Sequence, residues 1–350
     1  MSPLLGIPLA LLGIGLIIAV HEAGHALAAR AFRIGVREFA IGFGPVLLRG
    51  RLGATEMRLR AIPFGGFVRI AGDGEDRDAP DGFHRAPLFA RLMVIVAGVL
   101  ANVLIAALLV LLVSGPLVPT GKLVIDAVAP DGPAAAAGMR VGEAIIAIEE
   151  QPLDLIAASE QLSDALVDGA QRLRLRAADG SERIVVIPDA RPLGDPRGQL
   201  GIRVRAVGTN ATTSRPLLEG LVLGLERTPR LMGAVVAGYI ALPGTLFAPS
   251  PNGPPLSGPA GITASIAESA ADGGLPLFLL TIALISANIA VLNLLPIPPI
   301  DGGRAAGIIG SRIAPRLSRR VGPGLVMAGL VGLLGLAAVA TLFDLLRAIG

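Results

Sequence analysis

The 350-residue sequence predicts a polytopic α-helical membrane protein with four transmembrane helices, a membrane-associated β-hairpin region and one extracytoplasmic α+β domain. Composition is the first reason, because 53% of the residues are hydrophobic and 16% are charged, whereas soluble domains carry about 25% charged residues. The second is a set of long uncharged stretches at 1–20, 92–121, 273–300 and 321–343, which are suited to crossing a bilayer. The third is the polar segment 122–205, whose short alternating runs and turns indicate a separate folded unit.

The four spans are expected at about 4–28, 92–114, 275–297 and 322–346. A fifth uncharged stretch, 231–267, contains six prolines. We therefore expect an amphipathic helix on the membrane surface over 216–241 and a loop after it, with a full span as the alternative. The expected segments are the first helix (1–30), a cytoplasmic-side β region (31–91), the second helix (92–118), the outer domain (119–205), the amphipathic helix and loop (206–272), the third helix (273–304), and a cytoplasmic loop with the fourth helix (305–350).

Arginine placement predicts the orientation. The segment 30–91 holds eleven Arg and 301–320 holds five, so both are expected on the cytoplasmic side, whereas acids outnumber bases in 122–205, which is expected outside. The isoelectric point near 10.3 does not indicate nucleic acid binding, because the arginines fall between apolar spans rather than on one basic face. The chain has no Cys, so a transition metal would need His, Asp or Glu ligands.

Short strand patterns divide the polar segments. Between the first two spans, strands are expected at Phe39–Leu48, Glu56–Ile62 and Gly66–Ile70. The outer segment is expected to contain a small helix from Ala134 that ends at Gly138, and a hairpin turn at Asp179-Gly180. Its expected strands are Lys122–Val128, Ala144–Ile148, Arg172–Arg176 and Arg183–Ile187, with a helix over Leu155–Leu166.

The motif His21-Glu22-Ala23-Gly24-His25 lies at the end of the first apolar stretch. Residues four apart on a helix point the same way, so both imidazoles can bind one tetrahedral Zn²⁺, with Glu22 as the general base for an attacking water. Ionisable groups inside a membrane span are costly and indicate function. The alternative is a helix end whose His and Glu side chains are solvated.

A third ligand is expected at the end of the third span, where Asn293-Leu294-Leu295-Pro296-Ile297-Pro298-Pro299-Ile300-Asp301 carries three prolines and ends in a carboxylate. Proline removes backbone hydrogen bonds, so this irregular stretch must line protein or a water-filled cavity. Asp301 is the candidate ligand, and its capping of the next helix is an equal alternative. His84 is expected to be a surface residue.

These elements together resemble the site-2 protease family of intramembrane zinc metalloproteases, and most closely its bacterial regulator of sigma-E protease branch. The resemblance extends in order over nearly the whole chain. It is carried further by Gly42–Pro45, by Ile62–Val68, by Ala97–Asn102 with Val99 where the family usually has Pro, and by Leu256–Pro259. Within the third of these segments, Asn102 is expected to serve packing.

The outer segment resembles a circularly permuted bacterial PDZ domain. The matching residues are Val124–Val128, Pro133–Ala135, Ala137–Met139, Val141–Glu143 and Ile145–Ile148. Only one such domain fits between 121 and 190, whereas some relatives carry two. The resemblance favours a steric filter that keeps large outer domains from the site, with capture of a carboxy-terminal tail as the alternative.

The resemblance implies that His21, His25 and Asp301 bind Zn²⁺ and that Glu22 is the base. Asn288 and Asn293 would contact the substrate backbone or the oxyanion, with helix packing as the alternative. A strand formed by Phe64, Gly65, Gly66, Phe67 and Val68 would pair with an unwound substrate, with a purely structural hairpin as the alternative.

The expected function is an intramembrane zinc endopeptidase in the bacterial cytoplasmic membrane. Its partners would be the lipid bilayer and the transmembrane segments of single-span proteins that have already been trimmed, such as an anti-sigma factor or a remnant signal peptide. The PDZ-like domain would lie outside the membrane, with the active site toward the cytoplasm. The alternative function is a non-catalytic membrane scaffold that binds partners through the PDZ-like domain, but a scaffold has no need of Glu22.

Overall fold

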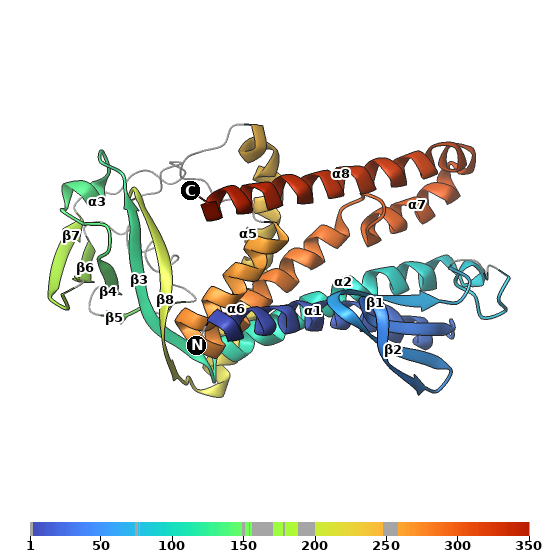
Figure 1. Ribbon diagram of the computed structural model, residues 1–350, viewed down its shortest axis with the longest axis horizontal. Coiled ribbons are helices and arrows are strands. Elements are labelled where there is room, and N and C mark those ends of the chain that lie inside the picture. Colours follow the sequence, from blue (N-terminus) through green and yellow to red (C-terminus); the bar gives the residue numbers. More distant parts are fainter. Residues whose placement is uncertain are drawn as a thin grey trace.

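The computed structural model describes residues 3–73, 76, 78–148, 151–153, 155, 171–177, 179–187, 200–247 and 258–349. The molecule is elongated (Figure 1). Long helices occupy its middle, strands β1 and β2 lie at one end, and the strands β3 to β8 lie at the other. The helix expected over Leu155–Leu166 lies outside the described residues, apart from Leu155 itself.

Four helices of the described chain are long and apolar enough to cross a membrane, which confirms the number of spans expected. The spans lie in α1 (Pro3–Ala31), α2 (Leu88–Ser114), α6 (Pro259–Leu294) and α8 (Pro315–Ile349). Their apolar parts run over Gly6–Ala31, Leu88–Ser114, Gly273–Leu294 and Gly322–Leu345, within a few residues of the expected bounds.

Helices α1, α2 and α6 pack against one another at small residues. A Cβ atom on Gly24 would lie 2.8 Å from the backbone carbon of Ala97, so α1 and α2 meet with almost no space between their backbones. Gly13 of α1 likewise lies against Ile282 and Phe278 of α6. Small residues permit such close approach between membrane helices. The Gly24–Ala97 crossing is next to His25, so it also fixes the position of the histidines relative to α2.

Helix α8 stands apart from α1 and α2 (Figure 1). Only 6% of its apolar window is buried within the molecule, and the remaining apolar surface is of the kind that lipid covers. It is joined to the other helices by α7 (Asp301–Ile313) at one end. Near its other end, the Asp344 carboxylate accepts hydrogen bonds from the backbone N–H groups of Gly258 (2.9 Å) and Gly261 (2.7 Å), at the start of α6.

The region after α1 forms two long strands, β1 (Val36–Leu52) and β2 (Thr55–Ile70), rather than the three short ones expected. They pair antiparallel, and both bend so far that the start of β1 is paired on both sides: Phe39 lies opposite Val68 and also opposite Met57. The last residues of β2 therefore pair with β1 on one side only. This edge is turned toward α1, whose buried Ala26 and Ala29 pack with Val36 and Ile70.

The strands β3 to β8 form one antiparallel sheet, the outer sheet, in the order β7–β6–β4–β3–β8, with β5 pairing β4. Their bounds are β3 (Val118–Val128), β4 (Ala144–Ile148), β5 (Gln151–Pro152), β6 (Gln171–Arg176), β7 (Glu182–Ile187) and β8 (Ile202–Thr213), with the short helix α3 (Pro133–Ala136) after β3. Gly138 ends that helix and Gly180 the β6–β7 turn, both with positive φ, as the sequence predicts.

Strand β8 is not among the strands that the sequence predicts. This strand pairs with β3 from Val118 opposite Thr213 to Val128 opposite Ile202. The expected domain boundary at 205 therefore falls inside β8. The domain must include the whole of this strand, because removing part of it would expose the backbone groups of β3 that pair with it. The long β3–β8 ribbon connects the outer sheet to α2 on one strand and to α5 on the other.

Helix α5 (Leu217–Phe247) is not among the four candidate spans. Val235 in its second half packs against Ala106 of α2 and Val291 of α6. The loop expected after it was wrong over 259–267, where α6 has already begun. Pro259 does not break a helix here, because it stands in the first turn of α6, where a missing N–H costs nothing. Gly274 then interrupts α6 with non-helical angles, and the span follows it.

Candidate metal centre

His21 and His25 lie on one side of α1, four residues and about one turn apart. Their ring centroids are 4.7 Å apart, with the planes nearly perpendicular. Both side chains are buried where α1 crosses α2. The helix continues past them to Ala31, so the spacing of the motif is held by regular helical geometry, as the sequence predicts.

Asp301 comes to these histidines from the other end of the chain. It is the first residue of α7, and the stretch from Leu295 to Ile300 turns the chain back from the end of the third span. Its Oδ2 lies 3.0 Å from Nε2 of His21 and 3.2 Å from Nε2 of His25. Burial works to raise the pKa of the Asp301 carboxyl, but the two imidazoles beside it, the hydrogen bond from His21 first, hold that pKa well below its usual range.

These three atoms are spaced as the ligands of one zinc ion. The two Nε2 atoms are 3.1 Å apart, so the three separations are 3.0, 3.1 and 3.2 Å. Ligand atoms around a tetrahedral zinc with bonds of about 2.0–2.1 Å lie about 3.3 Å from one another. Two imidazoles and one carboxylate leave a fourth position open, as catalytic zinc sites do. The residues therefore fit zinc.

Helix α2 contacts the far side of both imidazoles. The Nδ1 of His25 donates a hydrogen bond to the carbonyl oxygen of Val94 at 2.7 Å. A neutral imidazole that donates from Nδ1 has its lone pair on Nε2, the atom that faces His21 and Asp301. The Nδ1 of His21 lies 3.2 Å from the amide Nδ2 of Asn102.

Glu22 lines the same cavity as the three candidate ligands. The cavity measures about 350 Å³, and Phe67, Val68 and Asn293 are among the other residues that line it. Glu22 accepts a hydrogen bond from the backbone N–H of Val68 in β2. The edge of the sheet therefore reaches the carboxylate next to the histidines, and the cavity brings together the three candidate ligands, the Glu22 carboxylate and two half-buried residues of β2.

A family model for peptidase family M50 matches residues 9–336. The chain belongs to this family. A "putative zinc metalloprotease" of Nostoc sp. is 34% identical over 92% of this chain and 91% of its own length. A Synechocystis sp. protein of the same description is 30% identical over 97% of this chain and 94% of its own length. The chloroplast "probable membrane metalloprotease" of Arabidopsis thaliana is 30% identical over 95% of this chain and 78% of its own length.

Family membership, the His–His–Asp donor set and the four apolar helices make this chain a membrane-embedded zinc metalloprotease of family M50. The relatives are matched over nearly their whole lengths, so the likeness includes both the helices and the segments between them.

Not every residue predicted for the M50 site lies there. Asn293 lines the cavity, whereas the Asn288 amide donates to the Leu284 carbonyl of its own helix at 2.9 Å. Phe67 and Val68 line the cavity, and the side chain of Phe64 lies outside the described residues. His84 is exposed, as the sequence predicts, and its ring lies beside that of Phe83. The contact of Asn102 with His21 is not predicted by the sequence pattern, although the position of both residues in long apolar helices is a signal for it.

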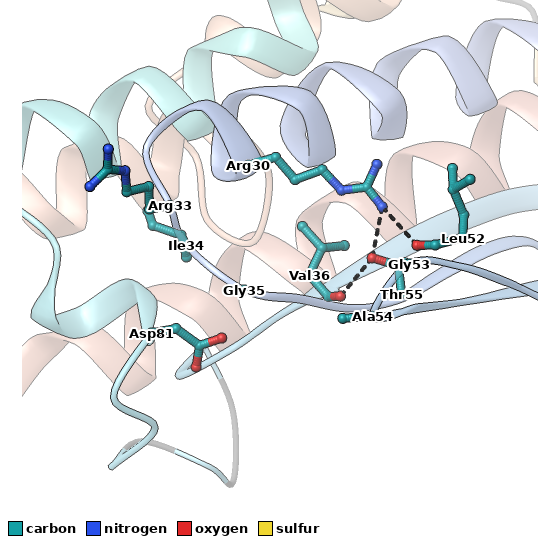
Figure 2. Close-up of a pocket in the computed structure, with 10 residues that line it drawn as sticks. All are labelled: Arg30, Arg33, Ile34, Gly35, Val36, Leu52, Gly53, Ala54, Thr55 and Asp81. Atoms are coloured by element: carbon teal, nitrogen blue, oxygen red, sulfur yellow. Dashed lines mark hydrogen bonds between the residues drawn. The ribbon is translucent and has the colours of Figure 1, made fainter.

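A second hollow, of about 480 Å³, lies where α1 meets the sheet (Figure 2). Figure 2 shows Arg30 at the end of α1 reaching Leu52, the last residue of β1, and Thr55, the first residue of β2. Arg30 donates to Thr55 Oγ1 at 2.8 Å, and Thr55 Oγ1 donates to the Val36 carbonyl at the same distance. These bonds tie the sheet to the helix that carries the motif. The hollow contains no member of the metal centre.

Proposed function

We propose that this M50 peptidase is an intramembrane zinc endopeptidase that cleaves transmembrane segments of single-span proteins already trimmed of their outer domains. In this proposal His21, His25 and Asp301 bind the zinc and Glu22 is the general base. The observation that carries it is the triangle of ligand atoms, 3.0–3.2 Å on each side, in one cavity with Glu22.

Zinc bound there would supply a Lewis acid for the carbonyl of the scissile peptide bond. Glu22 would take a proton from the attacking water and later give it to the leaving amine. The Val68 N–H would hold the Glu22 carboxylate in one orientation, since it donates a hydrogen bond to it. Asn293 would bind the substrate backbone or the developing oxyanion, because it lines the same cavity and carries an amide donor.

The strand Phe64–Val68 would bind the substrate by pairing with it. A helical peptide bond is hydrogen-bonded and shielded, so a protease must hold the substrate unwound. The end of β2 pairs with β1 on one side, and its residues Phe67 and Val68 line the site on the other. An extended peptide added at this edge would gain backbone hydrogen bonds beside Glu22.

The outer sheet supports a filtering role. We assign it as a PDZ-like domain outside the membrane, with β1 and β2 on the cytoplasmic side, as in the bacterial regulator of sigma-E protease branch. Its connection through the β3–β8 ribbon would keep it above the substrate path. A folded outer domain on a substrate would then collide with it, which restricts cleavage to trimmed substrates such as anti-sigma factors or remnant signal peptides.

The orientation can be tested with introduced cysteines, because the chain has none of its own. Ser181→Cys lies in the outer β6–β7 turn and Arg51→Cys in β1, and both positions are exposed. A membrane-impermeant maleimide should label Ser181→Cys on intact bacterial spheroplasts and Arg51→Cys only after permeabilisation. The reverse pattern would overturn the proposed orientation.

The central experiment is cleavage in proteoliposomes of a tagged single-span substrate, with or without a folded outer domain. Glu22→Gln should slow cleavage by about 100-fold or more and keep its zinc, because a general base contributes about 10²–10⁴ in rate. His21→Ala should lose zinc as well as activity. Wild-type cleavage by Glu22→Gln would refute the mechanism. A zinc-loaded wild type that cleaves neither substrate would favour the scaffold alternative.

A further inference from the structure

Helix α2 presents three successive positions, four residues apart, to the two imidazoles. The Val94 carbonyl accepts the hydrogen bond of His25, and the Asn102 amide contacts His21. Gly98 lies between them, and a Cβ atom there would lie 2.5 Å from Cε1 of His25 and 2.9 Å from Cε1 of His21. Four residues on a helix advance by about one turn, so these positions form one stripe along α2.

Asn102 is the polar side chain on this stripe. It is fully buried where α2 packs against α1 and α6, and a buried polar group is retained only with a partner. Its Nδ2 faces Nδ1 of His21 at 3.2 Å, whereas its Oδ1 has no hydrogen-bond partner in the described structure. The contact of Nδ2 with His21 is thus the side-chain hydrogen bond that Asn102 makes in the described structure.

An amide suits both tautomers of the neutral imidazole. When Nε2 of His21 carries the hydrogen and donates a hydrogen bond to Asp301, Nδ1 is an acceptor, and the Asn102 NH₂ can donate a hydrogen bond to it. When Nε2 binds a metal, Nδ1 carries the proton and needs an acceptor. Rotation of the amide by 180° about Cβ–Cγ then brings Oδ1, the unpartnered atom, to face Nδ1.

The backbone of Asn102 is itself fixed. The hydroxyl of Ser286 in α6 donates to the Asn102 carbonyl oxygen at 2.9 Å, and both residues are fully buried. The same helix leads through Leu295–Ile300 to Asp301. Asn102 therefore lies where α2 is joined to the helix that leads to the third candidate ligand.

We infer that Asn102 is a positioning residue for the zinc site, which orients His21 through Nδ1 and so raises the affinity for zinc. This rests on the proposed ligand role of His21. Loss of such an outer contact to a ligating histidine typically lowers metal affinity by about 10–100-fold. A residue that only packs would affect the stability of the protein but not its affinity for zinc.

The test uses the full-length protein in detergent and measures the zinc dissociation constant by competition with a chromophoric chelator. Asn102→Leu keeps the size of the side chain but cannot form the hydrogen bond, and we expect about 10–100-fold weaker zinc binding. Asn102→Asp supplies an acceptor for Nδ1–H, and we expect affinity within about threefold of wild type or tighter. Thermal unfolding of the zinc-free proteins shows whether each variant is folded.

The matched control is Ser286→Ala, which removes a buried hydrogen bond from the same residue without changing what the His21 ring contacts. Its zinc affinity should stay within about threefold of wild type, even if its unfolding temperature falls. The inference is wrong if folded Asn102→Leu binds zinc like the wild type, or if Ser286→Ala loses as much affinity as Asn102→Leu. His21→Ala separates the two proposals: wild-type zinc affinity in that variant would refute the ligand assignment itself.

Discussion

Glu22 of α1 accepts a hydrogen bond from the backbone N–H of Val68, in the last part of β2. This bond connects the carboxylate of the HExxH motif to the edge of the sheet along which a substrate would bind. Because it comes from the backbone, a change of the Val68 side chain leaves it in place, whereas proline removes it.

Val68→Pro should therefore slow cleavage by at least about tenfold while zinc stays bound, since Glu22 loses its orienting donor and proline distorts the edge of the strand. Val68→Ala keeps the N–H and should retain most of the activity. Both rates are measured on the trimmed substrate in proteoliposomes, with zinc content measured by elemental analysis. Equal rates for the proline variant and wild type would show that neither the bond nor the strand pairing matters for cleavage.

Gly98→Ala tests the space that α2 leaves for the imidazoles. The added methyl group would lie 2.5 Å from Cε1 of His25, whereas carbon atoms in contact are about 3.5–4.0 Å apart. The His25 ring cannot move away freely, because it is bonded to Val94 and lies against His21 and Asp301. We expect zinc affinity to fall at least about tenfold.

Gly238→Ala in α5 is the matched control for that substitution, because no atom lies within 4 Å of the added Cβ. Alanine there should leave zinc affinity unchanged and stabilise the helix by up to about 1 kcal/mol. If Gly98→Ala binds zinc as tightly as this control, the imidazoles are not confined by α2 in the way the structure indicates.

Composition and helical periodicity were enough to predict the spans and the histidine pair. An apolar run of about 20 residues has few options other than a membrane helix, and residues four apart on it must share a face. The clustering of His21, Glu22 and His25 therefore follows from the helical geometry of α1 alone. The pairing of Asp301 with that cluster is not local, and it was the family resemblance that favoured it over a helix cap. Asp301 in fact opens α7 and contacts both histidines.

Contacts that depend on how distant segments meet were harder to predict. The double pairing of Phe39 with Val68 and Met57 depends on the bend of two long strands, which three short alternating patterns did not reveal. The sequence predicts only a packing role for Asn102, because its partner, His21, is 81 positions away in another helix. Pro259 was misjudged because the same residue ends a helix or begins one, according to the turn in which it stands.

Asp344 should be the main polar contact that holds α8 against α6. Its Oδ2 accepts hydrogen bonds from the N–H groups of both Gly258 and Gly261, at the amino end of a helix, where negative charge is favoured. Asp344→Ala leaves these donors without that acceptor, and the free energy of unfolding should fall by about 1–3 kcal/mol. Asp344→Asn keeps an accepting oxygen and should lose less. Thermal unfolding in one detergent compares the variants, and equal midpoints would show that lipid or detergent, not Asp344, holds α8.

The outer sheet should lose stability in acid through Glu143. Burial works to raise the pKa of this carboxyl, but hydrogen bonds from the Arg183 side chain, at 2.8 and 3.0 Å, and from the Arg140 N–H lower it below its ordinary value of 4.5. The unfolded chain therefore takes up this proton first as the pH falls. The contribution of the pair is complete above pH 4.5 and is lost as the pH drops through the lower pKa of the folded domain.

At pH 7, Glu143→Gln should cost the outer sheet about 1–2 kcal/mol, a figure reduced because Arg183 is partly exposed to solvent. Hydrogen exchange of β4 and β7 in the full-length protein, corrected for the intrinsic effect of pH, measures this loss. The difference from wild type should shrink below pH 4.5, because wild-type Glu143 then becomes neutral as well. Glu182→Gln is the control. The side chains of Glu182 and of its partner Arg176 are both exposed to solvent, so this ion pair should contribute less than about 0.5 kcal/mol. A difference that stays constant with pH would mean that ionisation of Glu143 does not stabilise the sheet.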